Sequence, residues 1–88
     1  MVITAEVGAY VEIDVEQLVS EIMKEYGYSE KSEIGSEDIF EYISDHISYL
    51  KSRYSDCSSI DVVADGPSIF SLDEKTRNAI MDYINKAN

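Results

Sequence analysis

Apolar and polar residues alternate along the first segment of the chain. Between residues 2 and 14, an extended backbone would place the apolar set on one side and the other residues on the opposite side. The apolar positions are Ile3, Ala5, Val7, Ala9, Val11 and Ile13, and the intervening ones are Thr4, Glu6, Gly8, Tyr10, Glu12 and Asp14. A period of two predicts a half-buried β-strand. Gly8 lies near its middle and marks a point where the strand could bend or bulge.

The period then changes to that of a helix. Asp14 is a favourable N-cap with Gln17 three residues on, and Gly27 suits the left-handed residue that ends a helix. Six apolar residues between them form one continuous stripe: Val15, Leu18, Val19, Ile22, Met23 and Tyr26. We therefore predict a first helix between Asp14 and Gly27, followed by a polar loop over residues 29–35.

A second helical pattern begins at Ser36, a favourable N-cap that precedes two acidic residues. Its apolar stripe consists of Ile39, Phe40, Ile43, Ile47, Leu50 and Tyr54. Lys51 and Arg53 suit the negative end of the helix dipole. The pattern predicts a helix that continues to residue 54, and a loop around Cys57 follows it.

The last part of the chain combines a short strand with a helix. Residues 60–64 alternate and precede a turn signal, Asp65-Gly66-Pro67. Residues 68–71 fit either a short third strand or an irregular connection. Ser71 and Glu74 form a capping box for a third helix, whose apolar stripe is Leu72, Thr76, Ala79, Ile80, Tyr83 and Ile84. The order β-α-α-β-(β)-α predicts an α+β domain with three helices packed on one face of a two- or three-stranded sheet.

Size and composition indicate a single compact domain over residues 1–88 with one modest core. Cys57 is the only cysteine, which excludes an internal disulfide and a zinc site built from several cysteines. The N-terminal segment lacks the pattern of a signal peptide, and no apolar run approaches the roughly 18 residues of a membrane span. We expect a soluble, cytoplasmic protein.

Negative charge is concentrated in the first fifty residues. They contain twelve carboxylates and two lysines, a net charge of −10, whereas the whole chain carries −11. This exceeds the magnitude of ~2–8 that is usual for a small soluble domain. Such a field attracts basic surfaces and repels nucleic acid and anionic membranes. The chain also lacks a basic patch that would support direct nucleic-acid binding.

The predicted second helix carries the densest group of carboxylates. Asp38, Glu41 and Asp45 are spaced three and four residues apart, so they line one helix face. Four carboxylates over residues 37–45 lie about 4 Å apart along the axis, close to the ~3.4 Å between phosphates of one DNA strand. The row consists of Glu37, Asp38, Glu41 and Asp45; Glu30 and Glu33 would extend it, and Glu16, Glu21 and Glu25 would form a second row. The alternative is an ordinary solvated helix face.

Tyrosine is the second unusual feature, with seven residues in the chain. Tyr26, Tyr54 and Tyr83 lie on apolar stripes and are expected in the core. Tyr42 and Tyr49 lie off the main stripe of the second helix, next to the acids. Tyrosine beside charge is typical of a protein-binding surface, although these two residues could simply border the core.

No residue pattern identifies a reaction. His46 has neither a nucleophile nor a substrate pocket that the sequence can identify, so it does not predict a general base. Cys57 has no basic neighbour that would lower its pKa. Asp56, Asp61 and Asp65 do not match the spacing of a calcium-binding loop. We therefore expect no enzymatic activity, no cofactor and no dedicated metal site.

The segment Val11–Ile22, with sequence VEIDVEQLVSEI, resembles the strand-to-acidic-helix openings of small phage-encoded accessory proteins, and KEYGY at residues 24–28 continues the likeness. As a whole, the chain is similar in character to the DNA-mimic inhibitors that phages use against restriction or CRISPR machinery. This resemblance implies a class of function and gives no individual residue a role.

We therefore expect a non-enzymatic inhibitor that presents carboxylates to a basic, nucleic-acid-binding partner protein in a bacterial host cell. The predicted partner-binding residues are Glu30, Glu33, Glu37, Asp38, Glu41, Asp45, Tyr42 and Tyr49. The alternative is a small protein–protein interaction module, such as a phage regulator, an antitoxin or an assembly subunit, whose acidity serves solubility. A homodimer would form if the strand over residues 2–14 lay at a sheet edge and paired with a copy of itself.

Overall fold

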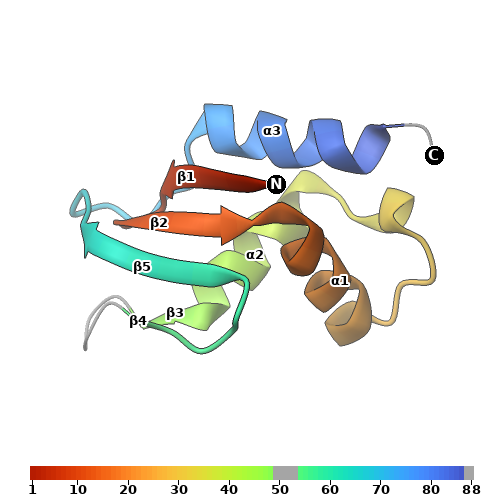
Figure 1. Cartoon of the computed structure of the whole chain (residues 1–88), viewed down its shortest axis with the longest axis horizontal. Coiled ribbons are helices and arrows are strands. Elements are labelled where there is room, and N and C mark those ends of the chain that lie inside the picture. Colours follow the sequence, from red (N-terminus) through yellow and green to blue (C-terminus); the bar gives the residue numbers. More distant parts are fainter. Residues whose placement is uncertain (49–53, 87–88) are drawn as a thin grey trace.

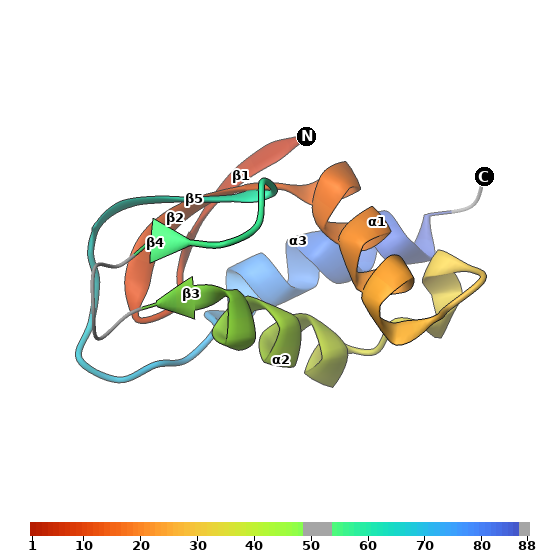
Figure 2. The ribbon, with the colours of Figure 1, turned by 90° about the horizontal axis from the view of Figure 1, so that it is seen from below.

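The main layer of the molecule is a three-stranded antiparallel sheet with helices on one side (Figures 1 and 2). The computed structural model describes residues 1–48 and 54–86. The sheet has the order β1-β2-β5, and a second, two-stranded sheet pairs β3 with β4. The strands are β1 (Val2–Glu6), β2 (Ala9–Asp14), β3 (Ile47–Ser48), β4 (Tyr54–Ser55) and β5 (Ile60–Asp65).

Three α-helices and one short 3₁₀ helix complete the fold. They are α1 (Val15–Tyr26), η1 (Lys31–Glu33), α2 (Ser36–His46) and α3 (Glu74–Asn85). In Figure 2, α2 and α3 lie beneath the sheet and α1 descends from the end of β2. The predicted α+β class, with a small sheet and three helices, is confirmed. No helix among the described residues is both long enough and apolar enough to cross a membrane.

The first segment forms a hairpin, so the prediction of one continuous strand over residues 2–14 was wrong. The chain reverses at Val7 and Gly8, where Gly8 has a φ of +84°. The register pairs Ile3 with Ile13 and Ala5 with Val11. Odd positions therefore face odd positions, and the same alternation fits a single strand or this hairpin equally well. β1 lies at an edge of the sheet.

The limits of α1 agree with the prediction, whereas α2 ends earlier than expected. The Asp14 carboxylate accepts a hydrogen bond from the Gln17 amide, and Gly27 ends α1 with a φ of 73°. α2 begins at Ser36, after Gly35, and ends at His46 instead of residue 54. The chain there enters β3, and the Asp56 amide donates to the His46 carbonyl at 3.0 Å. Pairing with β4 replaces the further helical turns, and residues 49–53 lie outside the described residues.

The start of α3 also differs from the prediction. Asp73, rather than Ser71, is the N-cap, and its carboxylate accepts hydrogen bonds from the amide and the hydroxyl of Thr76. The same carboxylate accepts a hydrogen bond from the Glu6 amide of β1 at 3.1 Å, and the Asp73 amide donates to the Glu6 carbonyl. These hydrogen bonds between α3 and β1 favour Asp73 over Ser71 as the N-cap. Residues 68–71 form an irregular connection and no strand.

The inner faces of the sheet and the helices share one apolar core. Its buried members are Ala5, Val7, Ala9, Val11, Ile13, Val15, Leu18, Val19, Ile22, Ile34, Ile39, Tyr42, Ile43, Ile47, Ile60, Leu72, Ile80 and Ile84. The odd positions of β2 are buried and the even ones are exposed or half-buried, as the alternation predicts. The outer face of the sheet carries exposed apolar and polar side chains together, including Val2, Tyr10 and Val63.

Replacing Asp73 by alanine is expected to lower the free energy of unfolding at pH 7 by about 1–2 kcal/mol, because α3 loses its cap and β1 loses a hydrogen bond. Burial alone would raise the pKa of Asp73, but hydrogen bonds from Thr76 and Glu6 outweigh it and lower the pKa below its ordinary value. The ionised carboxylate therefore stabilises the fold above pH ~4, and this contribution is lost as the pH falls through the lowered pKa. Urea unfolding between pH 3 and 7 measures it.

Asp73→Asn is the matched control for that experiment, since it keeps an acceptor oxygen but cannot ionise. The difference in stability between the unsubstituted protein and Asp73→Asn should shrink below pH ~4. Equal stability of the unsubstituted protein and Asp73→Ala at pH 7 would show that the cap contributes nothing.

Candidate functional site

The exposed surface of α2 carries a row of carboxylates. Glu37, Glu41 and Asp45 are exposed and follow one another at four-residue intervals. Residues at this spacing lie above one another on a helix, about 6 Å apart along its axis. Among the described residues, none of these three forms an ion pair with a lysine or arginine. Their charge is therefore directed at solvent.

Asp38 and Glu33, also predicted as partner-binding residues, have structural roles as well. The half-buried Asp38 carboxylate accepts hydrogen bonds from the Gly35 amide at 3.0 Å and the Tyr28 hydroxyl at 2.9 Å. The Glu33 carboxylate accepts from the amides of Glu30 and Ser29, and these hydrogen bonds lower its pKa. These amide and hydroxyl donors are uncharged, so they do not neutralise Asp38 or Glu33. Both residues still contribute to the negative field of the surface.

Carboxylates from α1 and α2 converge around Tyr26, the last residue of α1. Burial raises the pKa of Tyr26 to about 12, and the next contributions come from the charges of Glu41, Asp38, Asp45 and Glu25. Glu25 belongs to α1 and the other three to α2, so two helices supply one negative region. We add the neighbouring Glu37 of α2 and call these five carboxylates the acidic face: Glu25, Glu37, Asp38, Glu41 and Asp45.

Glu30 lies apart from the acidic face. It lines a cavity of about 570 Å³ between α1, η1 and the end of α3, together with Lys31 and Lys86. The Lys31 ammonium group donates to the Tyr83 carbonyl and lies 4.5 Å from the centre of the Tyr83 ring. Glu30 thus shares this cavity with two lysines, and its place in the row of carboxylates stays a prediction.

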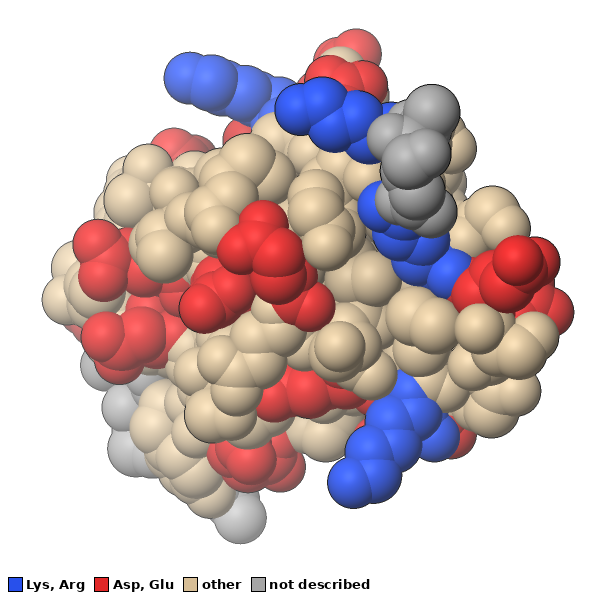
Figure 3. Space-filling model, turned by 45° about the vertical axis from the view of Figure 1, so that its right-hand side comes forward, with Lys and Arg blue, Asp and Glu red and all other residues tan. Residues whose placement is uncertain are grey.

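Positive and negative side chains are distributed unevenly over the surface. In Figure 3, lysine and arginine side chains lie along the upper edge and also toward the right and at the lower edge, and acidic side chains form several separate patches, one of them at the upper edge. Three of the cations belong to α3 or the residue after it: Lys75, Arg77 and Lys86. The acidic face is thus one part of a broadly negative surface, and α3 bears most of the balancing charge among the described residues.

Tyr42 is buried, which makes its predicted place on a partner-binding surface wrong. Its side chain is 4% exposed, and its hydroxyl donates to Glu21 on α1 at 3.3 Å. The ring lies edge-on to Tyr26, and its centroid is 4.2 Å from that of His46, with the two rings tilted by 38°. The stripe of α2 that faces α1 is wider than the apolar pattern indicated and includes this amphipathic ring. Tyr49 lies outside the described residues.

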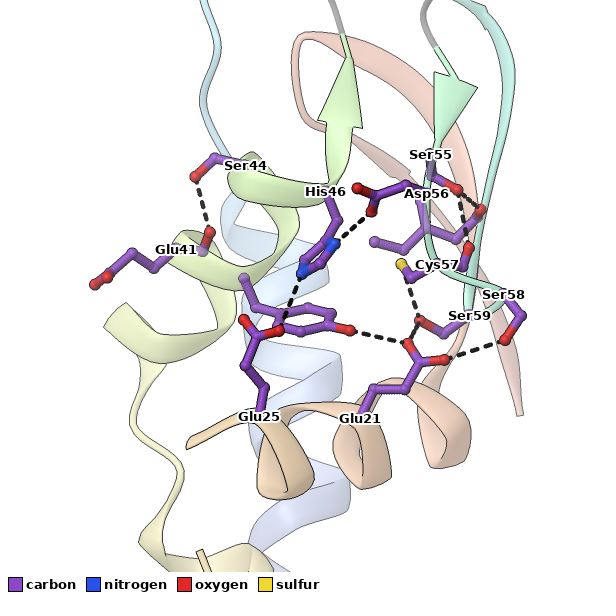
Figure 4. Close-up of polar contacts among 12 residues, drawn as sticks. Glu21, Glu25, Glu41, Ser44, His46, Ser55, Asp56, Cys57, Ser58 and Ser59 are labelled. Carbon is purple, nitrogen blue, oxygen red and sulfur yellow. Dashed lines mark hydrogen bonds and ion pairs between the residues drawn. The ribbon is translucent and has the colours of Figure 1, made fainter. Parts of the chain in front are cut away.

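A polar cluster joins α1 to the segment before β5 (Figure 4). Glu21 accepts hydrogen bonds from the hydroxyls of Ser58 and Ser59, from Tyr42 and from the Gln17 side chain. Ser59 is only 2% exposed. Buried hydroxyl groups need hydrogen-bond partners, and Glu21 supplies the acceptor for the buried Ser59 hydroxyl. This carboxylate, predicted as part of a second acidic row, therefore points inward.

His46 stands beside this cluster, between two carboxylates (Figure 4). Its Nδ1 contacts Oδ1 of Asp56, and its Nε2 lies 3.5 Å from Oε1 of Glu25. Burial lowers the pKa of His46, but Asp56 and Glu25 outweigh it, so the net pKa is raised. Burial raises the pKa of Cys57, whose thiol lies 3.6 Å from the Ser59 hydroxyl. These side chains line a cavity of about 520 Å³.

The sequence contained no signal for this group, since His46 and Asp56 meet only through the pairing of β3 with β4. Both residues lie near the C-terminal part of the predicted second helix, where the structure instead pairs β3 with β4. No protein-family model, curated protein or solved structure matches this chain. The function therefore has to be inferred from the geometry of its own surface.

Proposed function

We propose that this protein is a non-enzymatic inhibitor that binds the basic, nucleic-acid-binding groove of a partner protein through its acidic face. The observation that supports this proposal is the row of exposed carboxylates along α2, which consists of Glu37, Glu41 and Asp45. Within the described residues no lysine or arginine forms an ion pair with them. A partner's lysines and arginines would supply that missing charge.

The geometry of the acidic face suits a groove that normally holds a phosphate backbone. A row along α2 and a contribution from α1 present charge over roughly two helical turns, about 12 Å. At ~0.1 M salt, charges within about 10 Å act together because the Debye length is of that size. A groove lined with basic residues would therefore experience the face as a short polyanion.

A second candidate is a protein-interaction module that uses apolar surface, with acidity serving solubility. The observation in its favour is on the outer face of the sheet, where Tyr10 is 43% and Val63 is 53% exposed. Tyr42, the residue first expected to serve this function, is buried. Binding through this sheet face would depend weakly on salt, whereas binding through the acidic face would depend on it steeply.

Competition with DNA tests the leading proposal. The immobilised protein is exposed to a bacterial lysate at about 50 mM salt and then eluted with a duplex of about 20 bp, or with about 500 mM salt. We expect the duplex and the high salt to release the same proteins, and we expect mass spectrometry to identify them as nucleic-acid-binding. Proteins that stay bound in a large excess of duplex and at high salt would contradict the proposal and favour the sheet face.

A further inference from the structure

Three donor atoms of different chemistry meet at the end of α2. The imidazole of His46, a carboxylate oxygen of Asp56 and the thiol of Cys57 each offer one atom, and these atoms all lie within 4.8 Å of one another. His46 is half-buried, with 20% of its side chain exposed. The group opens into the cavity of about 520 Å³ that Glu21, Lys24, Glu25, Tyr42 and Ser58 also line.

The backbone holds these residues in place independently of their side chains. Ile47 pairs with Ser55 in the two-stranded sheet, and the Asp56 amide donates to the His46 carbonyl at 3.0 Å. The backbone of His46 and Asp56 is therefore held together before any ion binds. Cys57 follows directly in the chain, and its thiol lies beside the buried Ser59.

We propose that His46, Asp56 and Cys57 bind a zinc ion as an open site, with three protein ligands and a fourth position for water. Tetrahedral zinc with bonds of about 2.0–2.3 Å separates its ligand atoms by about 3.3–3.8 Å. The three donor atoms, all within 4.8 Å of one another, lie near this spacing. Nδ1 of His46 contacts Oδ1 of Asp56, and the ion would replace the proton between them.

The types of donor select the metal. A thiolate with an imidazole suits zinc and disfavours magnesium and calcium, which prefer oxygen ligands alone. One thiolate and one carboxylate would balance the two positive charges of the ion, so the occupied site would be neutral. Lys24 lines the same cavity, but it is exposed and its ammonium group can extend into water. Metal binding would release to solvent the Cys57 proton and the proton between His46 and Asp56.

Glu25 provides the outer contact that such sites require. A zinc-bound histidine normally donates its other ring N–H to a carboxylate, which fixes the tautomer and orients the ring. Nε2 of His46 lies 3.5 Å from Oε1 of Glu25, so the proton would lie on Nε2 and leave Nδ1 free for the ion. This arrangement revises the expectation of no dedicated metal site. Asp61 and Asp65, considered earlier with Asp56, belong to β5 instead.

Titration of the untagged, full-length protein with Zn²⁺ and with Co²⁺ tests this site. We expect one Zn²⁺ per chain with a Kd of about 1 μM or tighter. We also expect the Co²⁺ complex to show the near-ultraviolet charge-transfer band of a thiolate ligand and the visible spectrum of a tetrahedral ion. Cys57→Ser and His46→Gln should each weaken Zn²⁺ binding at least about 100-fold, and Glu25→Gln about 10-fold.

The matched control is Asp61→Asn, which removes a carboxylate close in sequence but outside the group, and it should leave the Kd unchanged. Circular dichroism confirms that each variant is folded. The Co²⁺ spectrum of the unsubstituted protein decides the question even if a variant fails to fold. Absence of the thiolate band, or Zn²⁺ binding that survives Cys57→Ser unchanged, would overturn the site and indicate adventitious binding to surface carboxylates.

Discussion

Replacing Glu37, Glu41 and Asp45 together by lysine is expected to weaken binding to the DNA-eluted proteins roughly 10- to 100-fold. Each exposed charge pair contributes up to about 1 kcal/mol, and reversal converts three attractions into repulsions. The fold should survive, since all three side chains are exposed and form no ion pair with a lysine or arginine of the described segments. Retention of the DNA-eluted fraction on the immobilised variant measures the loss.

The choice of residues matters, because two of the predicted carboxylates stabilise the fold. Reversing Asp38 would remove the acceptor for the Gly35 amide and the Tyr28 hydroxyl. Reversing Glu33 would release the amides of Glu30 and Ser29. Loss of binding in a variant that included either residue could not be distinguished from partial unfolding.

A second triple variant, Glu12→Lys with Asp61→Lys and Asp82→Lys, controls for net charge. These acids are exposed on the outer face of the sheet and on α3. This variant therefore has the same net charge as the first triple variant but keeps the acidic face intact. It should retain most of the binding. Equal losses in both variants would mean that the partner recognises overall charge and would rule out the acidic face as a specific surface.

Replacing Gly66 by alanine is expected to cost at least about 3 kcal/mol of unfolding free energy. Gly66 follows β5 and lies against β2, where Asp65 pairs with Ala9. An added Cβ would fall within 3.0 Å of three backbone atoms of Ala9. Since backbone cannot rotate away as a side chain can, the two strands must separate. For a domain of this size, the melting temperature should fall by at least about 12 °C.

Gly35→Ala is the matched control, because the position has an ordinary φ of −96° and the nearest atom to an added Cβ is 3.9 Å away. Gly35 is the N-cap of α2 and alanine is a poorer N-cap, so this variant should lose no more than about 1 kcal/mol of unfolding free energy. Thermal unfolding followed by circular dichroism compares the two variants directly. A Gly66→Ala protein as stable as Gly35→Ala would show that the contact between β5 and β2 is looser than the structure indicates.

Features whose physical causes are local could be predicted from the sequence. α1 lies between Asp14 and Gly27 as predicted, because a cap uses atoms within a few residues of it. The alternation before Asp14 identified which side chains face the core. The excess of carboxylates on α2 also followed from composition, but helical spacing placed Asp38 on one face with Glu41 and Asp45, whereas the structure exposes Glu37 and half-buries Asp38.

The other features of the fold and the site depend on contacts between segments distant in sequence, so local patterns could not predict them. The hairpin at Gly8 preserves the same alternation as one long strand, so no local pattern could reveal it. Pairing of β3 with β4 ends α2 at His46 and brings Asp56 to it. The packing of α1 against α2 buries Tyr42 and places Glu25 in the acidic face. Such pairing is stabilised by contacts between two segments, so the sequence of either segment alone does not predict it.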